Sequence, residues 1–276
     1  MSTLAWQRVR LIAVYTLREA LRQRAFGLLL VVALVFAVGA RGLRDLNFGA
    51  SELKFTADLG LGALSLFGSL LAIVGTVQTV FAEVEHRTLQ LIFARPVSRR
   101  EFVVGKLAGM QLMLGLFSLL MLLALGLMLR TREIELLPAL PGGMADGGLV
   151  SAGGLVLAVA AQWLKCGVLV AVMLLLCSIA QSRLYATVTG FLLLTAFHAH
   201  AILAGVCERI TGGLMRVIAT TVVWILPDFQ RFDLSAAVFV GNASALGDGL
   251  VLAAYGAALI TGYAALAAFP FRAREY

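Results

Sequence analysis

Residues 83–106, EVEHRTLQLIFARPVSRREFVVGK, carry both signs of charge and separate two long apolar segments. Charged side chains are costly in hydrocarbon, so this stretch must face water. Residues 88–93 favour a short helix that ends at Arg95-Pro96, because the residue before a proline is pushed out of helical geometry. Ser98 and Glu101 form a capping box that starts the next helix. The stretch therefore predicts an ordered aqueous surface that another molecule reads.

The composition places this surface in a membrane protein. The chain has 276 residues, of which 61% are hydrophobic and 13% are charged, with a mean hydropathy of +0.96. Soluble domains average about 45–50% apolar and about 25% charged residues. We therefore predict a polytopic helical membrane protein. Its net charge of +7 is explained by basic cytoplasmic flanks, and we do not expect nucleic acid as a partner.

Six segments are long and apolar enough to span a bilayer, which needs about 20 residues. An even number of spans puts both termini on one side. Lysines and arginines are more numerous in the segments that share that side, which predicts cytoplasmic termini. The six segments are 25–41, 60–82, 104–129, 152–180, 184–205 and 249–270.

Two further segments flank or interrupt these spans. Residues 1–24 place apolar and basic side chains on opposite arcs of a helix, which predicts an amphipathic helix at the cytoplasmic interface. A cleaved signal peptide is the alternative, although about 24 residues before the apolar run is long for a signal. Residues 206–248 form a long extracytoplasmic segment, in which 214–226 are too few to span and predict a re-entrant or interfacial helix.

Motifs for catalysis and cofactor binding are missing from the sequence. Gly105-Lys106 is followed by Leu107 and lacks the glycine-rich run of a phosphate-binding loop, so we expect no ATP on this chain. His198 and His200 are two residues apart on a predicted helix and do not share a face, so polar packing is favoured over a metal site. The three cysteines show neither metal nor redox spacing. We therefore predict no enzymatic activity and no bound cofactor or metal.

Lys165 is the basic residue that lies deep in an apolar segment. It lies about 24 Å along the helix from Gln181, toward the outer side. There it could line a substrate pathway, snorkel to the interface, or pair with another group inside the bundle. Gln162 is one turn away and would share its environment.

The order of these features resembles the ABC-2 type permeases, the membrane subunits of ATP-binding cassette exporters, over nearly the whole chain. The similarity includes an interfacial elbow helix and a charged loop with an acidic residue, Thr-Leu, Pro-x-Ser-Arg and Gly-Lys in that order. The chain departs from this pattern at Arg87, where the family usually has glycine. Leu226-Pro227-Asp228 and Phe232-Asp233 are similar to the family too. The layout most resembles compact six-span permeases related to that of nitrous-oxide reductase maturation.

The resemblance implies an all-α, type V exporter-like fold, with one transmembrane domain over 1–276, six spans and an elbow helix at 1–24. It implies that a separate cytoplasmic ATPase, which uses ATP and Mg²⁺, docks on a coupling loop at 83–106. A second permease chain, identical or different, and two ATPases would complete the transporter in the inner membrane of a prokaryote. The residues implied in coupling are Glu83, Glu85, Arg87, Thr88, Arg95, Pro96, Ser98, Arg99, Arg100 and Glu101.

Two other functions remain open at this point. A secondary transporter would need carboxylates within the membrane for ion coupling, and none lies deep in a predicted span. A membrane anchor or assembly factor could use the same charged loop to recruit a soluble partner without moving cargo. If the chain does transport, its apolar spans with few buried charges favour a hydrophobic or amphipathic cargo.

Overall fold

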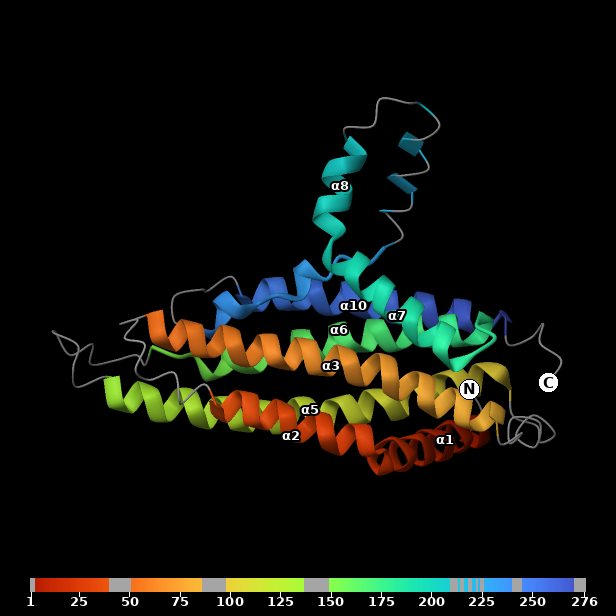
Figure 1. Cartoon of the computed structure of the whole chain (residues 1–276), viewed down its shortest axis with the longest axis horizontal. Coiled ribbons are helices and arrows are strands. Elements are labelled where there is room, and N and C mark those ends of the chain that lie inside the picture. The colour runs from red at the N-terminus through yellow and green to blue at the C-terminus, as the bar shows by residue number, and fades with distance from the viewer. Residues whose placement is uncertain are drawn as a thin grey trace.

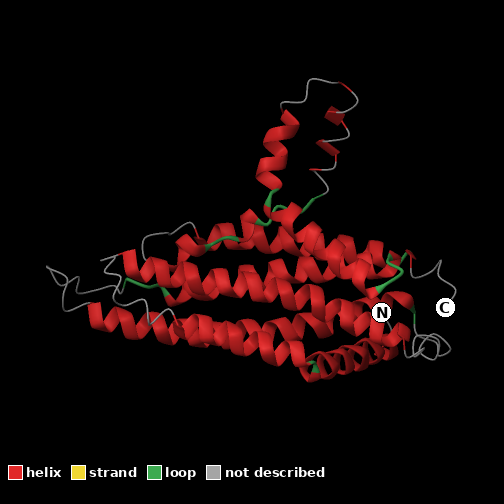
Figure 2. Ribbon diagram, in the orientation of Figure 1, coloured by secondary structure: helices red, strands yellow, loops and turns green. Residues whose placement is uncertain are grey.

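A computed structural model describes residues 3–39, 51–85, 98–136, 149–208, 226–239 and 245–270, with scattered positions between 213 and 223. The described parts are helices joined by loops and turns, with one isolated antiparallel bridge between Val150 and Phe239 (Figure 2). The all-α prediction is therefore confirmed for these parts of the chain.

The long helices lie side by side in an elongated bundle (Figure 1). Helix α6 packs against α3, α5, α7 and α10 and is the central helix. Its residues from Val168 to Leu174 are all buried, as expected for a helix that is apolar on every side. The bundle consists of α2 (Arg24–Gly39), α3 (Ser51–Glu85), α5 (Arg99–Leu136), α6 (Ala152–Ile179), α7 (Arg183–His198) and α10 (Ala245–Ala267).

Four of these helices, α3, α5, α6 and α10, are long and apolar enough to cross a membrane. A fifth span results if α7 and α8 (His200–Glu208), which meet at a bend of 67°, count as one. The predicted span at 25–41 corresponds to α2, whose apolar part is shorter. An integral membrane protein with four or five apolar spans is thus established among the described residues, and the sixth span stays a prediction.

The helices begin where the sequence supplies caps. The predicted capping box is confirmed at α5, where the Glu101 amide donates to Ser98 Oγ at 3.3 Å and the Ser98 amide donates to Glu101 Oε2 at 3.0 Å. Ser151 and Ser182 cap α6 and α7 in the same manner, each accepting a bond from an amide of the first turn.

Two helices extend well beyond the predicted spans. Helix α3 begins at Ser51 rather than residue 60, and α5 continues to Leu136 rather than residue 129. The far end of α5 is fixed by Glu133, a buried carboxylate that accepts a hydrogen bond from Arg130 at 2.7 Å and from the Val150 amide at 3.1 Å. Polar side chains therefore continue both helices past their apolar parts.

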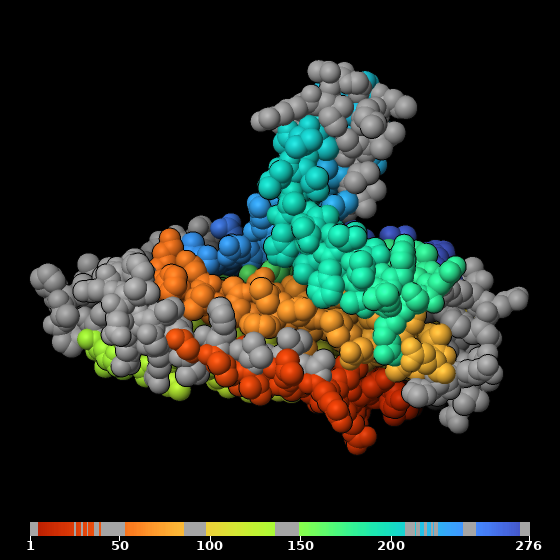
Figure 3. All heavy atoms as spheres, viewed as in Figure 1, coloured from red at the N-terminus to blue at the C-terminus, as the bar shows by residue number. Residues whose placement is uncertain are grey.

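The chain leaves the bundle and returns between α7 and α10. Helix α8 projects away from the other helices (Figures 1 and 3). The chain returns through the short helices η3 (Gln230–Phe232) and η4 (Ser235–Val238), and the Ser151 amide donates to the Val238 carbonyl at 2.8 Å. Gly154 must lack a side chain, because the Ala237 carbonyl occupies the place of its Cβ. Most of the predicted segment 214–226 lies outside the described residues.

Helix α1 (Thr3–Arg22) is amphipathic, as predicted, but its buried face meets protein. Val9, Ala13, Thr16 and Ala20 are all buried, and α1 packs mainly against α5. The sequence predicts an amphipathic helix at the cytoplasmic interface and does not show what covers its apolar arc. Its burial on α5 shows that α1 is part of the protein core at this end of the bundle.

Candidate functional site

The end of the bundle where α3 finishes and α5 begins, which we call the α3–α5 end, contains a buried group of charges. Lys106 of α5 is fully buried, and its Nζ lies 2.8 Å from Glu83 Oε1 and 3.6 Å from Glu19 Oε2. Its Nζ also donates to the Thr79 carbonyl at 2.9 Å. Glu83 is on α3 and Glu19 on α1, so one ammonium group joins three helices.

Close packing of backbones reinforces this junction. A Cβ at Gly105 would lie 2.7 Å from the Ile12 side chain, and a Cβ at Gly109 would lie 2.6 Å from the Ala13 carbonyl. Both glycines are on the face of α5 that meets α1, one turn apart. They allow α1 to approach near enough for Glu19 to reach the Lys106 cluster, which we define as Lys106, Glu83 and Glu19.

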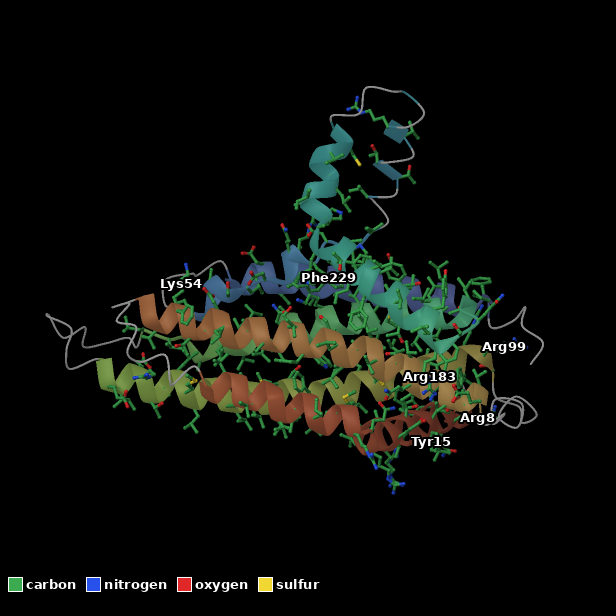
Figure 4. All side chains as sticks on the ribbon, viewed as in Figure 1. Arg8, Tyr15, Lys54, Arg99, Arg183 and Phe229 are labelled. Carbon is green, nitrogen blue, oxygen red and sulfur yellow. The ribbon has the colours of Figure 1, made fainter. Side chains whose placement is uncertain are left out.

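The predicted coupling residues fall into two groups at this end. Arg99, one of the predicted residues, lies at the same end of the bundle as Arg8 and Arg183, which were not predicted (Figure 4). Glu85 is exposed and pairs with Arg183 at 2.9 Å, and Glu101 lies 3.8 Å from Arg8. Glu83, by contrast, is only 3% exposed. Its carboxylate therefore faces the cluster rather than water. Arg87, Thr88, Arg95 and Pro96 lie outside the described residues.

Tyr15 reports on the negative charge of this end from the surface of α1. The Glu19 carboxylate, followed by partial burial and the Glu83 carboxylate, raises the pKa of Tyr15 above its ordinary value of 10.0. Tyr15 is 56% exposed, and Trp6 and Leu11 are exposed on α1 as well. The outward side of this helix therefore carries aromatic and apolar groups, as helices at a membrane interface do.

A second polar site lies between α3, α6, the end of α7 and η3–η4. It is a cavity of about 610 Å³. Its floor is formed by Lys165 and Gln162, one turn apart on α6, which are 3% and 6% exposed. Phe229 covers the lysine, with Nζ 5.9 Å from its ring centre. Lys165 therefore does not snorkel to the interface, because it points inward to this cavity.

Polar side chains surround the floor. Ser65 accepts a hydrogen bond from Lys165 Nζ. The rim of the cavity is exposed and carries both signs of charge. Figure 4 shows Lys54 toward one end of the bundle and Phe229 near its middle. The other rim and wall residues are Lys54, Asp58, Leu61, Gly62, His198, Gln230, Asp233 and Ser235.

Sequence reasoning found Lys165 and Gln162 but missed most of their surroundings. Asp58 was placed before the predicted span at 60–82, yet it lies on α3 and faces the cavity. The spacing of Lys54, Asp58, Leu61 and Ser65 is that of one helix face, and this signal was available. Phe229 and Asp233 are distant from Lys165 in the chain, and although Phe232-Asp233 resembles the family, nothing in the sequence places either residue beside the lysine.

The two histidines lie in different surroundings. His198 lines the Lys165 cavity, whereas His200 lies 4.0 Å from Asp228 and contacts the Val223 carbonyl at 3.1 Å. Within the described part of the chain, no cluster of three or more His, Cys, Asp or Glu side chains is placed to hold a metal ion.

Both sites belong to a chain whose sequence matches a known family. The sequence matches the family described as ABC-2 family transporter protein over residues 11–275. The chain belongs to the ABC-2 transporter family. No curated protein matches it. As an ABC-2 permease, it is a membrane component of an ABC transporter.

The two sites of this permease differ in how their lysines are partnered. Lys106 has two carboxylates within 3.6 Å. Lys165 has no carboxylate within 4.0 Å among the residues that the structure describes. The first arrangement is suited to holding helices together, and the second leaves positive charge facing a cavity.

Proposed function

We propose that this permease moves its cargo across the cytoplasmic membrane with energy from a separate ATPase subunit that docks at the α3–α5 end. The observation that carries the proposal is the Lys106 cluster. It joins α1 to the two helices that flank the charged loop, α3 and α5, so that a force applied to the loop reaches all three helices together. Membership of the ABC-2 family supports an ATPase partner, since this chain has no phosphate-binding loop of its own.

The distribution of basic residues supports a cytoplasmic position for the α3–α5 end. Arg8, Arg99 and Arg183 lie there (Figure 4), Arg100 is the second residue of α5, and the charged loop begins and ends there. Basic residues near the ends of spans favour the cytoplasm. With this orientation both termini are cytoplasmic, α1 is the elbow helix at the interface, and α2 is the sixth span.

The coupling step follows from these contacts. Closure of two ATPases moves the loop between α3 and α5. Because the Lys106 cluster and the Gly105–Gly109 face hold α1 against α5, the three helices turn as a rigid body rather than bending separately. Glu83 then acts as a positioning residue within the bundle. Contact with the ATPase is assigned to exposed residues at this end, among them Glu85 and Arg100.

The cavity at Lys165 is assigned to the cargo pathway. It lies away from the α3–α5 end, and its lining residues are mainly polar or charged. A complete transporter contains two ATPases and a second permease chain, and only the first of these associations depends on the α3–α5 end.

A secondary transporter is the second candidate, and one observation favours it. Asp58 and Asp233 line the Lys165 cavity, so carboxylates are present beside a lysine within the bundle. Ion coupling by such groups would need no ATPase. The two candidates therefore differ in whether a partner with a phosphate-binding loop accompanies the chain.

Affinity purification from native membranes, followed by mass spectrometry, separates the candidates. We expect a soluble ATPase at about one copy per permease chain, by analogy with two-chain, two-ATPase assemblies. Its absence under gentle extraction would refute the proposal. Arg100→Glu, an exposed charge reversal at the α3–α5 end, should reduce ATPase retention, whereas Lys54→Glu at the opposite end should not.

A further inference from the structure

The floor of the Lys165 cavity carries a positive charge without an ion-pair partner among the described residues. An ammonium group can donate several hydrogen bonds, yet the hydrogen-bond acceptor that the described structure gives Lys165 Nζ is Ser65 Oγ alone. The Phe229 ring adds a cation–π contact at 5.9 Å, at the limit of useful distance. A buried cation held by one hydroxyl and one ring lacks the paired anion that buried charges normally have.

Gln162 gives independent evidence for a missing partner. Its amide nitrogen donates to the Phe232 carbonyl at 3.5 Å, but its Oε1 is buried with no hydrogen-bond partner. A buried acceptor without a donor costs about 1–3 kcal/mol. Lys165 and Gln162 are one turn apart on α6 and lie on the same cavity. A cation and an unpaired acceptor are therefore presented side by side.

Neither rim carboxylate supplies the missing charge. Asp58 and Asp233 line the same cavity, but both are exposed, and in the described structure neither forms a salt bridge within 4.0 Å of Lys165 Nζ, although Asp233 acts on the lysine from a longer distance. Lys106 is the contrasting case, a buried lysine whose ammonium group has the Glu83 carboxylate at 2.8 Å and a backbone carbonyl at 2.9 Å. The difference is that no carboxylate among the described residues forms an ion pair with Lys165.

We propose that the cavity binds the anionic end of an amphipathic molecule, with its carboxylate, sulfate or phosphate on Lys165 Nζ and a hydrogen-bond donor on Gln162 Oε1. The proposal rests on the proposed function only where it calls this molecule cargo. It narrows the sequence-based expectation of a hydrophobic or amphipathic cargo to an amphipathic one that carries negative charge. The anionic group can belong to a free organic anion or to the headgroup of an acidic lipid.

Binding to the isolated permease tests this assignment. The chain is placed in phosphatidylcholine nanodiscs without ATPase or nucleotide, and dissociation constants are measured for decanoate and for decyltrimethylammonium, which has the opposite charge. We expect decanoate to bind more tightly. Lys165→Gln should weaken decanoate binding about tenfold or more, the loss of one charge-assisted hydrogen bond. Arg10→Gln, which removes an exposed positive charge on α1, should leave it unchanged.

Asp58→Asn gives a second variant that keeps the lysine. Removing a negative charge from the rim should strengthen decanoate binding, a change of opposite sign that a loss of folding cannot imitate. Equal binding of both probes, or equal effects of Lys165→Gln and Arg10→Gln, would overturn the proposal and indicate a neutral lysine. Because no ATPase is present, this result is independent of whether the ATPase co-purifies.

Adding phosphatidylglycerol to the nanodiscs distinguishes the two sources of the anion. If the site takes acidic lipid headgroups, phosphatidylglycerol competes, and the decanoate affinity of the unmodified chain falls while that of Lys165→Gln does not. If the site takes free organic anions, the affinity of the unmodified chain stays the same. Both results support an anion site, and each names its source.

Discussion

Replacing Lys106 with methionine would leave the Glu83 carboxylate buried without its counter-charge. The two groups are 2.8 Å apart, and their side chains are 0% and 4% exposed. Removing one partner of a buried ion pair costs roughly 3–5 kcal/mol, because the remaining charge stays out of water. The Thr79 carbonyl also loses the hydrogen bond that it accepts from Lys106. We therefore expect Lys106→Met to destabilise the permease by roughly 3–5 kcal/mol.

The matched control is the other ion pair at this end. Glu85 and Arg183 are 2.9 Å apart, but their side chains are 58% and 44% exposed. An exposed pair contributes roughly 0.2–1 kcal/mol, so Arg183→Met should cost no more than that. The assay is reversible unfolding in mixed micelles, in which the free energy of unfolding of each variant is compared with that of the unmodified chain.

Two outcomes decide whether the Lys106 cluster acts as described. The double variant Lys106→Met with Glu83→Gln should recover most of the lost stability, because the Glu83 charge is then no longer buried without Lys106. Glu19→Gln should cost less than Glu83→Gln, because Glu19 lies 3.6 Å from the ammonium group and is partly exposed. If Lys106→Met costs no more than Arg183→Met, the cluster does not hold the three helices and the coupling argument fails.

Three further changes test other parts of the fold. Gly109→Val should push α1 away from α5, cost about 1–3 kcal/mol and lower the yield of a cysteine cross-link between the two helices. Gly62→Val, whose added side chain meets open space, should do neither. Ser98→Ala should cost about 1 kcal/mol and speed hydrogen exchange at the Glu101 amide. Exchange as slow as in the unmodified chain would contradict the cap. Glu133→Gln should destabilise the opposite end by about 1–3 kcal/mol, measured by unfolding, since it weakens two part-buried hydrogen bonds of a buried carboxylate.

Features that depend on neighbours in the chain were predictable. The capping box at Ser98 and Glu101 involves residues three positions apart, and the structure has the predicted bonds. The long apolar helices α3, α5, α6 and α10 were found because a continuous apolar run is itself the signal. Their ends were not found, because α3 and α5 continue through polar turns that hydropathy alone counts as loop.

Features that depend on distant residues could not be predicted. Glu83 and Lys106 bound the charged loop, so in the sequence both belong to its aqueous surface. In the structure they are turned inward, because α1 covers them and supplies Glu19. The amphipathic pattern of α1 showed that one face is apolar, but it did not show whether lipid or α5 covers that face.

The same reasoning separates the two buried lysines of this permease. Hydropathy marks Lys165 as unusual and treats Lys106 as ordinary, since only Lys165 lies deep in an apolar run. The structure corrects the interpretation of Lys106, because both lysines are at most 3% exposed and they differ in their partners. Where the protein supplies the anion, as at Lys106, the charge fixes helices in place. Where it does not, as at Lys165 beside the unpaired Gln162 oxygen, the charge is left for a ligand, and function is expected there rather than stability.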